Sequence, residues 1–84
     1  MPEGSPTKSL FSKDYDRFLA SLRKAREDAG LTQADVARRL KRPQSFVSKC
    51  ESGERRVDVI EAAAFCQVYG ITLLRLLPRA GEVP

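Results

Sequence analysis

Pro43 is the residue that most constrains how this chain can fold. Proline is tolerated in the first turn of an α-helix and breaks the interior of one, so a helix must begin close to residue 43. The preceding segment, which ends at about Leu40, opens with Thr32 and carries Asp35 three residues later, a spacing typical of a helix N-terminus. Only two residues remain to connect these helices. We therefore expect two short helices that cross steeply at a tight turn.

The rest of the chain favours three further helices, because apolar residues recur at helical spacing and no segment alternates in the way typical of a strand. The five expected helices span about residues 14–29, 32–40, 43–52, 58–69 and 73–77. Four of them are followed directly by residues that end helices, Gly30, Gly53, Gly70 and Pro78. Asp58, with Glu61 three residues later, and Thr72 are the expected caps of the last two. The predicted fold class is all-α, a compact domain of five helices.

The 84 residues are enough for one domain. Residues 1–12 are rich in Pro, Gly, Ser and Thr, which predicts a flexible N-terminal arm. The helical domain is expected to span residues 13–78, and residues 79–84 to form a short C-terminal tail. In the fourth helix the expected buried face consists of Val59, Ala62, Ala63, Cys66 and Tyr69.

Positive charge is concentrated in one quarter of the chain. Residues 38–56 hold seven Lys and Arg residues and two Glu residues, a net charge of +5, whereas the whole chain carries +4. A local basic patch of this kind is the electrostatic pattern expected of a phosphate-binding surface, although solvated charge on a helical surface is also common.

Several classes of function find no support in the sequence. There is no histidine, and Cys50 and Cys66 are too far apart for a C-x-x-C motif, so we expect two buried apolar side chains and neither a metal nor a redox centre. Paired carboxylates and phosphate-binding glycine loops are also lacking, which argues against an enzyme. We expect no cofactor, and the sequence gives no sign of a small-molecule ligand. Without a secretory signal or a membrane-length apolar run, a soluble cytoplasmic protein is expected.

Three segments carry a resemblance to a known family. LTQADVARRL, PQSFVSK and ESGERR resemble the phage-repressor and Cro regulators, often called the XRE family, over about residues 22–77. The resemblance implies a repressor-like helix-turn-helix domain that binds double-stranded DNA, with the helix at about Pro43–Ser52 in the major groove. Two residues depart from the family pattern. Lys41 stands where the turn usually has glycine, and Pro43 where serine often caps the next helix.

The resemblance also implies roles for individual residues. Its base-reading positions are occupied here by Gln44, Ser45, Ser48 and Lys49, residue types that suit the major groove. Positions expected to contact phosphates are Gln33, Arg42, Ser52, Arg55 and Arg56. Arg26 and Glu51 correspond to a structural ion pair. Phe46 can touch a thymine methyl group or pack against the neighbouring helix, and its spacing from Val47 and Cys50 favours packing.

The last helix predicts how the protein associates. Its outer face is apolar, with Leu73, Leu74 and Leu77, and an isolated patch of that kind favours a homodimer interface over an intramolecular core. The predicted function is a homodimeric transcriptional regulator that binds a palindromic operator. The alternative is a helical protein-interaction module, such as an antitoxin or adaptor, for which DNA binding is secondary.

Overall fold

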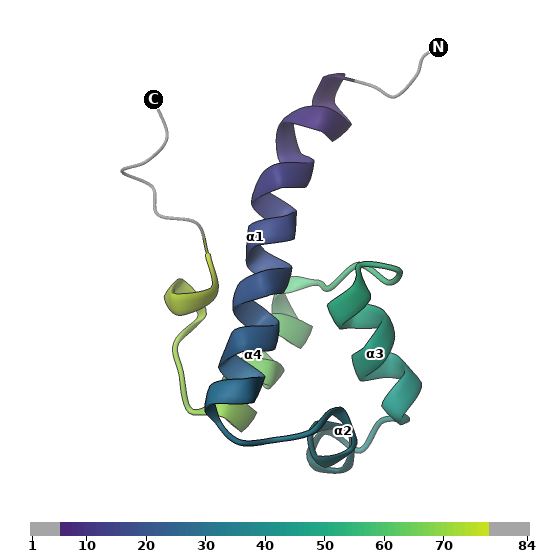
Figure 1. The fold of residues 1–84 in the computed structure, drawn as a ribbon, viewed down its shortest axis with the longest axis vertical. Helices are drawn as coiled ribbons and strands as arrows, with labels where there is room; N and C mark the ends of the chain where they lie inside the picture. Colours follow the sequence, from purple (N-terminus) through teal and green to yellow (C-terminus); the bar gives the residue numbers. More distant parts are fainter. Residues whose placement is uncertain (1–5, 78–84) are drawn as a thin grey trace.

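Four α-helices and one 3-10 helix make up the fold, as the computed structural model shows for residues 6–77, with side chains described from residue 13 (Figure 1). The elements are α1 (Pro6–Asp28), α2 (Gln33–Leu40), α3 (Gln44–Ser52), α4 (Val59–Tyr69) and the 3-10 helix η1 (Leu73–Leu76). No strand occurs in this part of the chain, so the all-α prediction is confirmed. In Figure 1, α3 and η1 lie on opposite sides of α1.

Helix α1 begins at Pro6, well before the expected start near residue 14. The backbone of residues 6–12 is therefore helical, so the helix starts earlier than expected, and the flexible arm stays a prediction. A proline is favourable at the first position of a helix, which is how α1 begins here in spite of the polar composition of this segment. The remaining predictions for the arm and the tail concern residues 1–5 and 78–84, outside the described residues.

The predicted caps of α2 and α4 are confirmed. The Thr32 hydroxyl accepts a hydrogen bond from the Asp35 amide at 3.1 Å, and the Asp35 carboxylate accepts one from the Thr32 amide at 2.9 Å. Asp58 and Glu61 form the same reciprocal box, at 2.7 and 3.1 Å. The hydrogen bond from the Thr32 amide is the main reason that the pKa of Asp35 is lowered. Thr72 makes no side-chain cap, so that prediction is wrong for the single turn of η1.

The core is built around Phe65 on α4, which is fully buried. Its ring stacks on those of Phe46 and Tyr69, with centroids 6.1 Å apart in both pairs. Phe46 is buried as well, which confirms that it packs inside the domain. The predicted face of α4 is wrong at Val59 and Ala63, which are exposed. The prediction is confirmed at Ala62, Cys66 and Tyr69, but it missed Phe65, because α4 is apolar on nearly every side and periodicity could not define the whole buried face.

Lys41, in the turn between α2 and α3, adopts the left-handed conformation with φ +58° and ψ +44°. Its amide and that of Arg42 donate to the carbonyl groups of Arg38 and Ala37, at 3.2 and 3.0 Å, and so end α2. Glycine adopts this conformation without strain, whereas any residue with a Cβ atom is strained by about 1–2 kcal/mol. The departure from glycine at this position therefore costs stability.

We expect Lys41→Gly to raise the free energy of unfolding by about 0.5–1 kcal/mol, the relief of strain less the extra freedom of glycine in the unfolded chain. Lys41→Ala is the matched control, since it removes the same side chain and keeps Cβ. Urea denaturation of the three proteins gives the comparison. A Lys41→Gly protein that is no more stable than Lys41→Ala would show that the turn is not strained.

Candidate nucleic-acid interface

The outward face of α3 carries four exposed polar side chains: Gln44, Ser45, Ser48 and Lys49. None of the four side chains donates or accepts a hydrogen bond, or forms an ion pair, with a residue of the described part of the chain. On the opposite face of the same helix, Phe46, Val47 and Cys50 are buried. The helix is therefore anchored on one side and presents a polar row on the other. The predicted base-reading residues thus lie together on one surface.

Glu51 at the end of α3 anchors the helix to α1. Its carboxylate is buried and receives two hydrogen bonds from Arg26, from Nε at 2.7 Å and from Nη2 at 3.1 Å. Arg26 also donates from Nη1 to the carbonyl group of Leu31 at 2.9 Å. The bond to Glu51 is the main reason that the pKa of Arg26 is raised. This is the ion pair that the resemblance implied, and it links α1, α3 and the start of α2.

Gln33 at the first position of α2 is a third partner of this carboxylate. Its Nε2 donates to Oε1 of Glu51 at 3.0 Å. A glutamine amide has two N–H donors, so one remains after this bond. The side chain is half-buried, this bond orients it, and the second donor has no partner among the described residues. Sequence reasoning identified the residue but not the contact that orients it.

Arg55, after α3, is already engaged within the protein. Its Nη1 and Nη2 donate to the Glu61 carboxylate at 2.8 and 2.7 Å, and Nη1 also donates to the Arg56 carbonyl group. These bonds raise the pKa of Arg55 and lower that of Glu61. The sequence marked Glu61 as a capping residue only, and its role as the partner of Arg55 was missed. A phosphate at Arg55 must use the remaining N–H donors or displace Glu61.

Phe46 holds two arginines near the surface. The guanidinium carbons of Arg42 and Arg55 lie 4.0 and 4.9 Å from the centre of its ring, within the range of cation–π attraction. Arg42 is exposed and has no acidic partner among the described residues. Phe46 thus fills the core and also positions the guanidinium of Arg42, which lies in the turn between α2 and α3.

The loop that follows α3 is held by contacts with α3 and with α1. The Ser52 hydroxyl donates to the Lys49 carbonyl oxygen and accepts from the Glu54 amide, both at 3.2 Å. Arg56 is exposed and lies over the ring of Tyr15, 4.2 Å from its centre. The Tyr15 hydroxyl in turn accepts a hydrogen bond from the Val57 amide at 3.0 Å. Ser52, the last residue of α3, and Arg56 therefore lie at opposite ends of a loop that these contacts hold in place.

Comparisons with known proteins agree with this geometry. A family model described as a helix-turn-helix domain matches residues 17–77. A solved structure of an XRE-family like protein from Pseudomonas syringae pv. tomato str. DC3000 is similar to this chain at 48% identity, with a TM-score of 0.79 over 83% of this chain and 85% of that one. This chain is a helix-turn-helix protein of the XRE type. A search of curated protein sequences found no match.

The matched residues 17–77 include α2, the turn, α3 and the loop after it, so they contain the whole candidate interface of this helix-turn-helix protein. In the XRE-type domain, α2 and α3 are the two helices of the motif, and the turn between them contains Lys41. The family assignment confirms the resemblance seen in the sequence, and it supports a DNA-binding regulator.

The sequence argued against a metal or redox centre, for which the cysteines and the acidic side chains are the residues to consider. Cys50 and Cys66 are free and buried, as predicted, and burial raises the pKa of both thiols. Within residues 13–77, no three His, Cys, Asp or Glu side chains gather in a way that could hold a metal ion. Among the helices described, none combines the length and apolar character needed to cross a membrane.

We expect Glu51→Gln to lower the free energy of unfolding by about 3 kcal/mol, because it leaves the Arg26 guanidinium without its buried counter-charge. Arg23→Ala is the control: Arg23 lies 3.9 Å from the same carboxylate but is exposed, so its loss should change stability by less than about 0.5 kcal/mol. Chemical denaturation measures both. Equal effects of the two substitutions would contradict the role given to the buried pair.

Proposed function

We propose that this protein regulates transcription by binding a palindromic DNA operator as a homodimer, with α3 of each subunit in the major groove. The observation that carries the proposal is the polar row of α3, Gln44, Ser45, Ser48 and Lys49, which is exposed and unpartnered on a helix anchored from behind. Glutamine can bind adenine through two hydrogen bonds and lysine can donate to guanine, while serine tolerates several bases. Gln44 and Lys49 are therefore the main specificity residues of the proposal.

Phosphate contacts are proposed for the residues that surround this row. Gln33 has one amide donor left beside Glu51, at the N-terminus of α2, where the helix dipole also favours an anion. Arg42 and Arg56 are exposed and held over aromatic rings, so their guanidinium groups are positioned before DNA arrives. Ser52 and Arg55 complete the set. Arg55 enters it with donors that its ion pair with Glu61 leaves over.

The exposed apolar residues support the homodimer. Among the described residues, the large hydrophobic side chains that stay exposed are Val59, Ile60, Leu74 and Leu77, with 79% of Leu74 accessible. Two of them, Val59 and Leu77, line an apolar groove of about 410 Å³ together with Leu73. Leu73 itself is half-buried against the core, so Leu74 and Leu77 contribute most of the proposed interface.

The alternative function is a protein-interaction module. It rests on the same exposed apolar residues, because a different protein could cover them just as a second copy of this chain could. It differs in what it requires of α3. An adaptor has no need for an anchored helix that presents Gln44 and Lys49 among surrounding arginines. A monomer in solution that does not bind duplex DNA would favour the alternative.

Gln44→Ala should weaken binding to the preferred duplex by about 1–3 kcal/mol and relax the preference at one base per half-site, because the substitution removes a base contact. Gln33→Ala should weaken binding to all duplexes alike, by about 1 kcal/mol, because it removes a phosphate contact. Fluorescence anisotropy with a set of single-base variants of the duplex separates these effects. An unchanged base preference in Gln44→Ala would refute its role in reading the sequence.

Leu74→Asp should convert the dimer into a monomer without unfolding it, since the side chain is almost fully exposed in the single chain and a charge there opposes association. Ser45→Asp, which adds the same charge to α3, is the control and should remain dimeric. Sedimentation equilibrium with circular dichroism measures both properties. If Leu74→Asp associates like the unaltered protein, the interface lies elsewhere.

A further inference from the structure

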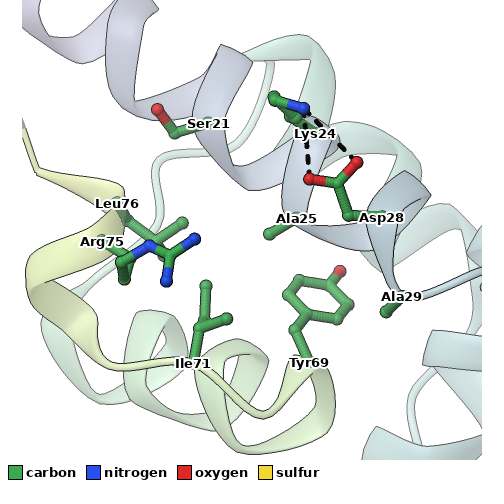
Figure 2. A pocket seen from close by; sticks show the side chains of 9 residues that line it. All are labelled: Ser21, Lys24, Ala25, Asp28, Ala29, Tyr69, Ile71, Arg75 and Leu76. Atoms are coloured by element: carbon green, nitrogen blue, oxygen red, sulfur yellow. Dashed lines mark hydrogen bonds and ion pairs between the residues drawn. The ribbon is translucent and has the colours of Figure 1, made fainter.

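A pocket of about 270 Å³ lies between α1, the end of α4 and η1 (Figure 2). None of its lining residues belongs to α2 or α3, so it is separate from the polar row. Its volume falls slightly below the usual range of ligand sites, about 300–1,000 Å³, which fits only a small molecule. Two of its polar groups, one a buried hydroxyl and the other a charge, have no partner in the described part of the fold and carry the argument.

The first of these groups is the Tyr69 hydroxyl. The residue is only 8% exposed, and its hydroxyl oxygen is buried without a hydrogen-bond partner among the described residues. Figure 2 shows the oxygen at the end of the ring that points from α4 toward α1. A buried hydroxyl without a partner costs about 1–3 kcal/mol, so a hydrogen-bond partner supplied from outside the fold would be stabilising. Burial raises the pKa of Tyr69, and the group therefore keeps its proton and can donate it.

The second group is the guanidinium of Arg75 on η1. It makes no ion pair or hydrogen bond with any described residue, and Figure 2 shows it turned toward the interior of the pocket. The other two charges on the wall cancel, because Lys24 Nζ lies 3.2 Å from the Asp28 carboxylate. Arg75 thus leaves the pocket with one unbalanced positive charge. A guanidinium matches the geometry of a carboxylate, which it can bind through two parallel hydrogen bonds.

We propose that this pocket binds a small organic monocarboxylate, whose carboxylate pairs with Arg75 while the Tyr69 hydroxyl donates to an oxygen of the same molecule. The apolar part of the ligand lies against Ala25, Ile71 and Leu76, which supply the remaining wall. This inference does not depend on the DNA-binding proposal. Sequence analysis gave no sign of such a ligand, because Tyr69 was counted as a core residue and the pocket is assembled from three elements.

The test is a titration of the ¹⁵N-labelled full chain with benzoate and with butyrate, followed by amide NMR shifts. We expect saturable shifts at residues around the pocket, with a Kd of about 1 mM or below for a ligand of this size. Benzamide, which keeps the ring and lacks the charge, should bind at least about tenfold more weakly, because the pairing with Arg75 is lost.

Variants connect the binding to the two groups. Arg75→Gln should weaken benzoate binding by about tenfold, whereas Arg39→Gln, which removes an exposed arginine from α2, should leave it unchanged. Tyr69→Phe should weaken it several-fold while the protein stays folded, because only an unpartnered oxygen is removed. The proposal is overturned if neither carboxylate gives saturable shifts, or if the shifts are the same in Arg75→Gln.

Discussion

The hydrogen bonds to the buried carboxylate of Glu51 are the interaction on which the placement of α3 and its polar row depends. Glu51 belongs to the last turn of α3, receives two hydrogen bonds from Arg26 of α1, and accepts one from the amide of Gln33 at the start of α2. A buried charge is costly unless its hydrogen bonds are satisfied, and here the donors come from two other helices. One side chain therefore fixes the position of α3 relative to the proposed phosphate-binding end of α2. This arrangement preorganises the surface before DNA is bound.

Aromatic rings hold positively charged side chains in place around α3. Phe46 lies beneath Arg42 and Arg55, and Tyr15 lies beneath Arg56. Three of the seven basic residues of this quarter are thus held over rings, and one of these, Arg55, is partly neutralised by Glu61. Long arginine side chains lose considerable freedom when they bind, and holding them in advance reduces that loss. On the other side of α1, the pocket with Tyr69 and Arg75 leaves α2 and α3 untouched.

Local signals in the sequence predicted most of the fold. Thr32 with Asp35 and Asp58 with Glu61 act over three residues, and Gly53 and Gly70 end helices through their own left-handed conformation, so each can be read from neighbours alone. Two features that depend on packing were missed. Phe65 could not be distinguished on a helix that is apolar on nearly every side, and the pairing of Arg55 with Glu61 depends on how the loop folds back. The candidate DNA-binding residues were predicted from the family resemblance. The structure adds the hydrogen bonds and ring contacts that position several of them.

The central claim is that the polar row of α3 reads a DNA sequence, with one row from each subunit of the dimer. In vitro selection of bound duplexes from a random pool tests it most directly, because the pool contains every candidate half-site and the protein itself selects among them. The account predicts enrichment of an inverted repeat whose half-sites are centred about 10–10.5 base pairs, or a multiple of that, apart, so that both α3 helices enter major grooves on one face of the duplex. A pool that shows no enriched sequence after repeated rounds would contradict it.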